Sequence, residues 1–421
     1  MAFSGLCAKI CPPSFEAMNP LLKSIRLRNF LSYGPVASEI ELSRLNVLIG
    51  PNGSGKSNLI EAVDVLRSTP SDVTRPIREG GGVEDWLWKG VSSGSKTTAE
   101  IGVTVNYPEG AASLRYKLAF TMVGQRFELT DESVERPYAM PGEHDVYFFY
   151  RYQGGRPLLN VRAKPEAQAA SSEDRVRRSL RREDVVLDQS ILSQRKDPDQ
   201  YPEITYLGNQ FGKAKLYREW NLGRNTEPRK PQKVDLPGDF LSESANNLAL
   251  VLNDLENRSE TRKTINEYLN KFYESAEAVT SRLQGGTVQI FIHERGLKEI
   301  PGTRLSDGTL RYLCLLAVLC HPEPPSLICL EEPELGLHTD ILPTVAELLV
   351  EASCRTQLIV TTHSDVLVSA LSSHAESVLV CDRDEDGTRL RHLEPSKLKE
   401  WLEKYPLGEL WRMGEIGGTR W

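Results

Sequence analysis

The sequence predicts an α/β fold with a mixed central sheet, an antiparallel β subdomain and a helical insertion. A glycine-rich turn joins a short apolar strand at 45–50 to an amphipathic helix at 57–67. Residues 97–164 hold several strand-like runs separated by glycine and proline, a pattern typical of an antiparallel sheet. Residues 308–361 alternate apolar helices and strands, as a parallel α/β unit does.

The remaining elements follow from hydrophobic periodicity. Residues 22–30 alternate apolar and polar side chains, which predicts a half-buried strand, and 287–294 reads in the same way. Charge and helix formers dominate 171–285, but heptads are not sustained, so this segment predicts short helices and no long coiled coil. The predicted helices there are 175–184, 211–221, 241–257 and 261–279. Near the C-terminus the elements are a helix at 308–320, a strand at 326–330, a helix at 340–354 and a strand at 357–361.

Composition restricts the class of protein. The chain has 421 residues, 39% of them hydrophobic, and a net charge of −7, so a disordered chain and a globally basic nucleic-acid coat are excluded, whereas a local basic patch is not. No apolar run approaches the roughly 20 residues that cross a bilayer, and no secretion signal opens the chain, so we expect a cytoplasmic protein without a membrane partner. The seven cysteines are scattered, which favours reduced thiols, and we expect no zinc at Cys7 and Cys11.

GPNGSGKS at 50–57 is the clearest functional signal. Glycines at Gly50, Gly53 and Gly55 let backbone N–H groups curl around phosphate oxygens at a helix N-terminus. Lys56 would reach the β- and γ-phosphates, and Ser57 would bind Mg²⁺. The predicted nucleotide-binding segment is Gly50, Pro51, Asn52, Gly53, Ser54, Gly55, Lys56, Ser57 and Asn58.

Two carboxylates end the strand at 326–330. Glu331 would hold Mg²⁺, and Glu332 would orient or deprotonate an attacking water. Many phosphate-binding proteins of this kind carry Asp at the first position, and we expect the longer Glu331 side chain to shift the metal slightly. The alternative is a charged strand end at the surface.

His363 follows the strand at 357–361, at the edge where ligands of open α/β sheets bind. There it would hydrogen-bond the γ-phosphate. A lone histidine after an apolar strand is more often structural, but the phosphate-binding loop upstream favours the functional role.

LSDGTLR at 305–311 opens an apolar helix. Ser306 would cap this helix, and the backbone at Gly308 would be free to meet an anion. Two helix N-termini would compete for one γ-phosphate from the same side, so we expect a second copy of the chain to present Ser306 and Gly308. The alternative is an ordinary capped helix.

Together these motifs resemble the ABC-type ATPase head of the SMC, RecF and overcoming-lysogenization-defect branch, close to bacterial predicted AAA-like ATPases. In this resemblance LSDGTLR corresponds to the ABC signature motif, EEPELGLH corresponds to the Walker B motif and D-loop, and TTHSD corresponds to the H-switch. The resemblance implies a P-loop fold and head-to-tail dimers with two ATP and Mg²⁺ between the Lys56 loop of one copy and the Ser306 helix of the other. LRNFLSYG at 27–34 resembles the opening strand, which lies near the adenine in this family. The Q-loop glutamine of the family is not identifiable here.

This resemblance divides the chain into four segments. We expect a flexible N-terminal tail at 1–20, a first ATPase lobe at 21–170, the helical insertion at 171–285 and a second ATPase lobe at 286–421. The expected activity is Mg²⁺-dependent hydrolysis of ATP, in a dimeric ATP-gated sensor or scaffold of anti-phage defence with a separately encoded effector. The alternative is a RecF-like DNA-binding clamp in repair. A transporter ATPase is disfavoured by the missing Q-loop and the EEPELGLH variant.

Three weaker signals complete the sequence. Residues 381–394 contain D-x-D-x-D-G, but Leu393 occupies the twelfth position of an EF-hand loop, so a hairpin turn at 385–387 is expected instead. The Trp- and Gly-rich C-terminus at 409–421 would dock on the body or on a partner. Two basic clusters would either track phosphates or form solvated faces. The first cluster is Arg175, Arg177, Arg178, Arg181 and Arg182, and the second is Lys213, Lys215, Arg218, Arg224, Arg229, Lys230 and Lys233 with Tyr217 and Trp220.

Overall fold

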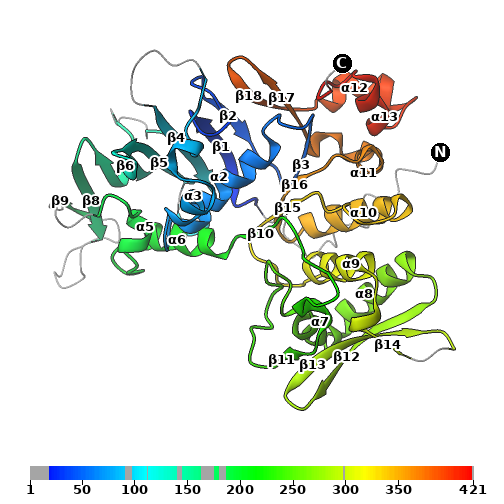
Figure 1. Cartoon of the computed structure of the whole chain (residues 1–421). Coiled ribbons are helices and arrows are strands. Elements are labelled where there is room, and N and C mark those ends of the chain that lie inside the picture. Colours follow the sequence, from blue (N-terminus) through cyan, green and yellow to red (C-terminus); the bar gives the residue numbers. More distant parts are fainter. Residues whose placement is uncertain are drawn as a thin grey trace.

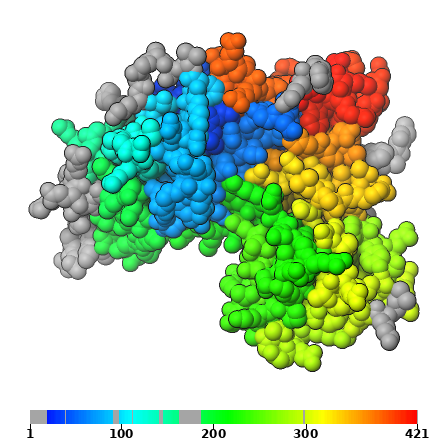
Figure 2. All heavy atoms as spheres, viewed as in Figure 1, coloured from blue at the N-terminus to red at the C-terminus, as the bar shows by residue number. Residues whose placement is uncertain are grey.

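In a computed structural model of the protein, three sheets and their helices form two lobes joined at a parallel sheet (Figure 1). The structure describes residues 19–90, 97–110, 112–139, 145–162, 175–179, 186–296 and 299–419. Residues 1–18 of the expected tail, the Cys7–Cys11 pair, Arg181 and Arg182 lie outside the described residues. Figure 2 shows a hollow between the lobe that carries the N-terminal half of the chain and the lower lobe.

The central sheet has six strands in the order β10-β15-β16-β3-β17-β18. All neighbours are parallel except β17 and β18, which form an antiparallel hairpin. Every residue of β3 and β16 is buried, as expected of parallel strands covered on both faces. The strands are β3 (Leu45–Ile49), β10 (Lys215–Tyr217), β15 (Leu327–Glu331), β16 (Gln357–Thr361), β17 (Val378–Asp384) and β18 (Gly387–His392).

Alternate residues of these strands enter two different cores. Val47 and Ile49 pack with helices α9 (Asp307–Leu319) and α10 (Leu342–Ser353). Leu48, between them, packs with helix α2 (Lys56–Ser68) in the other core. The central sheet therefore has a helical layer on each face, and its strand ends are left free to build a site.

The second core also contains an eight-stranded antiparallel sheet in the order β2-β1-β4-β5-β6-β7-β8-β9. The antiparallel sheet predicted over 97–164 is therefore confirmed, and it is extended by strands from both sides of that range. The strands are β1 (Leu22–Arg28), β2 (Ser38–Glu41), β4 (Thr98–Val105), β5 (Leu114–Val123), β6 (Arg126–Glu135), β7 (Phe148–Gln153), β8 (Arg156–Arg162) and β9 (Arg175–Ser179).

The segment expected as a helical insertion contains both helices and strands. Its helices are α5 (Ile191–Gln194), α6 (Pro202–Lys213), α7 (Leu248–Glu256) and α8 (Ser259–Phe272). The predicted helix at 211–221 is wrong, because the chain leaves α6 after Lys213 and β10 pairs with β15. The predicted helices at 175–184 and 261–279 are wrong in part, because β9 occupies Arg175–Ser179 and β12 (Ala276–Gln284) begins after α8. The boundaries of the four predicted segments stay predictions.

A third, small sheet lies in the lower lobe with α7, α8 and α9 (Figure 1). Its strands are β11 (Gln232–Lys233), β12, β13 (Thr287–Glu294) and β14 (Ile300–Pro301). The predicted strand at 287–294 is therefore confirmed, as are the elements predicted between 308 and 361.

The remaining helices are short. They are α3 (Arg75–Glu79), α4 (Val83–Trp86), α11 (Asp365–Ala370), α12 (Pro395–Leu402) and α13 (Leu407–Met413). Within the described ranges, no helix combines the length and the apolar composition that a membrane crossing requires.

Candidate nucleotide-binding site

Strand register brings the predicted site residues to one edge of the central sheet. Glu331 pairs with Thr361, and Thr361 pairs with Leu48 on β3. The turns that follow these three strands carry Glu332, His363 and the glycine-rich loop. Because the strands are parallel, their carboxyl ends meet at the same edge, where open α/β sheets bind ligands.

The glycine-rich loop runs from β3 to α2 in a conformation that needs glycine. Gly55 has φ of 104°, and a Cβ there would lie 2.3 Å from the Thr388 Oγ1 atom. Gly50 has φ of 152°, and a Cβ there would lie 2.3 Å from the Cys381 carbonyl oxygen. The loop is therefore seated against the β17–β18 hairpin, and side chains at these glycines would lift it away.

Lys56 begins α2 and is only 5% exposed. Its ammonium donates hydrogen bonds to the carbonyl oxygens of Gly50, at 2.8 Å, and Pro51, at 3.0 Å. Burial lowers the pKa of this ammonium, and the neighbouring Glu332 acts in the opposite direction. The side chain thus curls back over the loop, where its charge faces any phosphate bound there.

Ser57 and Glu331, the predicted metal pair, are brought together. The Ser57 hydroxyl donates a hydrogen bond to the Glu331 carboxylate. Burial raises the pKa of Glu331, and the nearby Glu61 and Glu332 carboxylates raise it further, whereas Arg218 and Ser57 lower it. A hydroxyl and a carboxylate are the oxygen ligands that Mg²⁺ uses beside phosphate, and a divalent cation would relieve the crowding of negative charge, so these residues fit the ion.

Glu332 and His363 also face each other. The His363 Nε2 atom lies 3.7 Å from the Glu332 Oε1 atom. Glu332 has φ of 45°, an unfavourable value for a residue with a side chain, and its N–H donates to the Thr361 carbonyl oxygen at 3.0 Å. Burial, and then the charge of Lys56, lower the pKa of His363, which favours a neutral imidazole at pH 7.

Sequence reasoning missed Glu334, which holds the His363 turn. Its Oε1 atom accepts hydrogen bonds from the Thr362 hydroxyl, at 2.7 Å, and from the His363 N–H, at 2.8 Å. Its Oε2 atom is buried and has no hydrogen-bond partner among the described residues. The signal in the sequence is the third acid of EEPE, but its position beyond the strand end does not connect it to the His363 turn.

Ser306 and Gly308 lie at the N-terminus of α9, a different helix from the one that follows the glycine-rich loop. Ser306 caps α9 as predicted, since its hydroxyl accepts the Thr309 N–H at 3.1 Å. A Cβ on Gly308 would lie 2.9 Å from the Gly336 carbonyl oxygen. Figure 1 shows α9 beside the lower lobe, apart from α2. The first half of the predicted site is therefore assembled within the chain, and the signature helix is held elsewhere.

Burial changes the interpretation of the second basic cluster. Arg229 is 4% exposed and donates hydrogen bonds to the carbonyl oxygens of Leu222 and Leu305 and to Asp307. Tyr217 and Trp220 are 3% and 7% exposed. These three residues therefore neither track phosphates nor form a solvated face. Tyr217 and Trp220 belong to the core, and Arg229 holds the turn before α9.

Two more supports come from segments distant in the sequence. The Thr388 hydroxyl donates to the Ser54 carbonyl oxygen at 2.7 Å, and Asn58 donates to the Ser32 hydroxyl at 2.6 Å. A cavity of about 640 Å³ lies beside them, lined among others by Ser32, Asn58, Trp88 and Arg383. The predicted hairpin at 385–387 is confirmed, since β17 and β18 pair up to Asp384 and Gly387.

The C-terminal segment docks on the body of the same chain. Gly418 donates its N–H to Asp382 at 3.0 Å and accepts the Trp411 indole N–H at 3.0 Å. A cavity of about 590 Å³ lies between this segment and the loop, lined by residues that include Pro51, His363, Trp411 and Arg412. The tail thus forms one wall next to the candidate site.

The fold and the clustered motifs are those of a P-loop ATPase head of the ABC/SMC type. A family model described as "AAA domain, putative AbiEii toxin, Type IV TA system" matches residues 45–369, which is more than half of the chain, and the chain belongs to this family.

Curated relatives share a shorter stretch. The chain is 35% identical over 98 residues to the DNA replication and repair protein RecF of Streptococcus uberis, covering 23% of this chain and 24% of that protein. It is 33% identical over 97 residues to the chromosome partition protein Smc of Mycolicibacterium paratuberculosis, covering 23% of this chain and 8% of that protein. The chain therefore spans a quarter or less of each of these relatives.

Solved Smc heads share the fold over nearly the whole chain. An Smc head bound to the C-winged helix domain of ScpA has a TM-score of 0.55 at 16% identity, covering 90% of this chain and 99% of that one. The Smc head from Pyrococcus furiosus, with an extended coiled coil and the C-terminal domain of ScpA, has a TM-score of 0.55 at 14% identity. This match covers 91% of this chain and 99% of that one.

Proposed function

We propose that the protein hydrolyses ATP to ADP and phosphate with Mg²⁺. The observation that carries this proposal is the meeting of Lys56, Ser57, Glu331, Glu332 and His363 at one edge of the central sheet. Phosphoryl transfer needs few covalent steps from the protein, so catalysis depends on positioned charges and an oriented water. These five side chains supply both requirements.

Each side chain then has a distinct role. Lys56 neutralises the β- and γ-phosphates, and the loop N–H groups bind their oxygens. Glu332 orients the attacking water and accepts its proton, while the neutral His363 donates a hydrogen bond to the γ-phosphate. Ser57 and Glu331 would hold Mg²⁺, which when bound neutralises charge on the phosphate oxygens. The cavity beside Ser32, Asn58 and Trp88 would take the base.

We expect two copies of the chain to complete each site. Ser306 caps the N-terminus of α9, a ready anion site, but α9 lies apart from α2, the helix that Lys56 begins (Figure 1). In a head-to-tail dimer the Ser306 helix of one copy would face the γ-phosphate bound by the other. ATP would then close the dimer, and hydrolysis would open it.

For the biological role, we propose an ATP-gated sensor or scaffold in bacterial anti-phage defence that controls a separately encoded effector. The family description names a toxin and a toxin–antitoxin system, and two of the similar Smc heads are bound to a domain of a separate protein, ScpA. Copurification of the products of adjacent genes with the Glu332→Gln chain in ATP tests this role. A chain that captures none of them in either nucleotide state would contradict it.

A RecF-like DNA clamp is the second candidate, favoured by the aligned RecF segment. It would use the arginines at 175–182, which extend in part along the edge strand β9. Charge reversal of Arg177, Arg178 and Arg181 should then abolish DNA binding and its salt dependence. Absence of DNA binding at about 50 mM salt would remove this candidate.

The ATPase itself is tested by phosphate release from purified protein with and without Mg²⁺. Activity should require the metal and should be lost in Lys56→Ala. Metal-independent turnover, or turnover retained in Lys56→Ala, would contradict the assignment.

A further inference from the structure

Arg218 lies beside the predicted metal pair without belonging to any motif. It follows β10 directly, and the pairing of Tyr217 with Leu330 places it next to Glu331. Its Nε atom lies 3.5 Å from the Glu331 Oε1 atom. A cation therefore already accompanies the carboxylate that Mg²⁺ would need.

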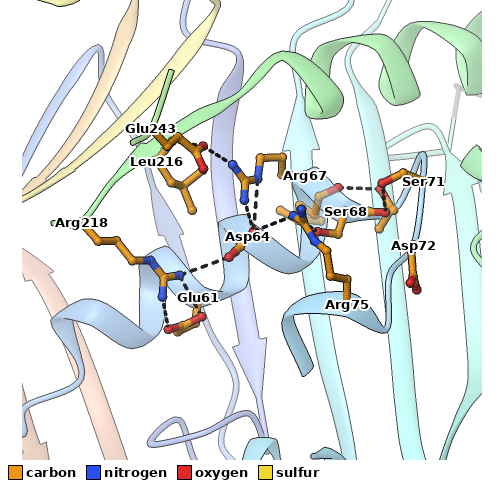
Figure 3. Close-up of polar contacts among 12 residues, drawn as sticks. Glu61, Asp64, Arg67, Ser68, Ser71, Asp72, Arg75, Leu216, Arg218 and Glu243 are labelled. Atoms are coloured by element: carbon orange, nitrogen blue, oxygen red, sulfur yellow. Dashed lines mark hydrogen bonds and ion pairs between the residues drawn. The ribbon is translucent and has the colours of Figure 1, made fainter. Parts of the chain in front are cut away.

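The principal partner of Arg218 is a different acid. Its two terminal nitrogens bind Glu61 in a forked pair, at 2.6 and 2.9 Å, and one of them also reaches Asp64 at 3.3 Å (Figure 3). Glu61 is four residues after Ser57 on α2, so it lies on the same face of that helix. Forked pairs of this kind are the strongest arginine contacts, and they fix the guanidinium.

Neighbouring hydrogen bonds and ion pairs hold the backbone that carries Arg218 against α2. Glu243 accepts the Leu216 N–H at 3.0 Å and also pairs with Arg67 of α2 (Figure 3). Arg67 in turn binds Asp64 at 2.7 Å. The end of β10 is thus tied to α2 from both sides, and Arg218 has little freedom to leave.

The contact between Arg218 and Glu331 differs from these pairs. It is single and long, whereas the contact with Glu61 is double and short. Glu331 can therefore exchange Arg218 for another cation without breaking the Glu61 pair. Arg218 then acts as an internal competitor, because its charge occupies the carboxylate that the metal must take.

We propose that Arg218 is a positioning residue that holds Glu331 before the metal binds and sets the concentration of Mg²⁺ that the site requires. This inference rests on the proposed nucleotide function. Removing the competitor should let Mg²⁺ bind at lower concentration. Removing the Glu61 carboxylate should raise the Mg²⁺ concentration that the site requires. Arg218 would then be left to pair with Glu331, and a negative charge near the metal would be lost.

The test measures binding of a fluorescent ATP analogue as Mg²⁺ is titrated, alongside hydrolysis. Arg218→Gln should lower the half-saturating Mg²⁺ concentration about fivefold, while affinity for the analogue in EDTA stays unchanged. Glu61→Gln should raise this concentration, and Glu61→Gln combined with Arg218→Gln should cancel most of that rise. Arg218→Lys keeps the charge and should stay closer to the original chain than Arg218→Gln.

Arg75→Gln is the matched control, because Arg75 faces Asp64 at 3.8 Å from the same network but makes no contact with Glu331. A half-saturating Mg²⁺ concentration that is unchanged in Arg218→Gln, or shifted equally in Arg75→Gln, would overturn the inference. Failure of the original chain to bind the analogue with Mg²⁺ would instead overturn the proposed function.

Discussion

Two carboxylates, the buried Glu132 and the half-buried Glu331, show how differently the antiparallel sheet and the nucleotide edge treat negative charge. Glu132 on β6 is 2% exposed and accepts hydrogen bonds from Tyr116 at 2.7 Å, Ser190 at 2.5 Å and the Ile191 N–H at 2.9 Å. Glu331 on β15 has one hydroxyl donor, a long contact to an arginine and two acids nearby. The first group is satisfied within the fold, whereas the second is not.

This difference separates a structural group from a site. The donors to Glu132 are uncharged and come from three positions that the fold holds in place, so nothing from outside is required. Apart from the Ser57 hydroxyl, the groups around Glu331 are charged and the contact with Arg218 is exchangeable, so a divalent cation would improve its surroundings. The same contrast applies to Lys56, whose ammonium is held by loop carbonyls that cannot neutralise its charge.

The largest effect on hydrolysis is expected from substitution of Glu332, the proposed general base. Glu332→Gln should slow hydrolysis by about 10²- to 10⁴-fold, the usual contribution of a general base, while ATP stays bound and the dimer stays closed. Single-turnover hydrolysis and particle size in ATP measure both outcomes. Glu323→Gln is the control, since that carboxylate is exposed in another cavity. Full turnover in Glu332→Gln would remove Glu332 from the role of base.

Loss of the loop ammonium should be the next largest effect. Lys56→Ala should weaken ATP binding about 10- to 100-fold, because charged hydrogen bonds to the phosphates are lost. Equilibrium binding of labelled ATP measures this change. Lys23→Ala, an exposed lysine on β1, should bind ATP normally. Equal affinity in Lys56→Ala and the original chain would contradict the loop assignment.

The buried Glu132 carboxyl should affect the pH dependence of the free energy of unfolding. Burial raises its pKa to about 7, against an ordinary value of 4.5. Between these values the unfolded chain releases the proton first, so the contribution of Glu132 to stability falls as the pH rises from 4.5 to about 7. The free energy of unfolding of Glu132→Gln should therefore gain roughly 3 kcal/mol relative to the original chain over this window.

Denaturant unfolding at pH 4.5 and pH 8 measures that gain. Glu403→Gln, in an exposed position, should show none. A difference between Glu132→Gln and the original chain that stays constant with pH would show that Glu132 has an ordinary pKa.

The smallest effect is expected at the docked C-terminus. Gly418 has φ of 71°, and a Cβ there would meet Val380 at 3.1 Å and Trp411 at 3.2 Å. Gly418→Ala should destabilise the docked tail by about 1–2 kcal/mol and expose Trp411 to quenchers. Gly124→Ala is the control, because Gly124 also has a positive φ but a Cβ there would meet no other atom. It therefore separates the effect of backbone strain from that of steric contact with Val380 and Trp411. Equal quenching of Trp411 in both variants would argue against docking.

The sequence predicted the elements that local pattern determines. The strand before the glycine-rich loop, the helix after it and the cap at Ser306 all depend on neighbouring residues, and all are confirmed. Strand β10 was missed because its three residues lie in a charged segment and become a strand only by pairing with β15. Tertiary burial here overrides local propensity.

The same reason explains which parts of the site were missed. Thr388 and Arg218 contact the motifs from segments that no spacing rule connects to them, and Glu334, although it belongs to EEPE, acts on the distant His363 turn. Residue type alone does not distinguish such supports from surface residues. Arg218 and Arg229 belonged to one basic cluster in the sequence, yet one faces the metal pair and the other braces the signature turn.

Sharing of each site between two copies of the chain is most directly tested by mixing two inactive variants. Lys56→Ala disables the loop, and Ser306→Arg disables the signature helix. If each site takes one part from each copy, mixed dimers keep one intact site, and the mixture should recover hydrolysis that neither variant shows alone. No recovery in a sample shown to contain mixed dimers would contradict the account.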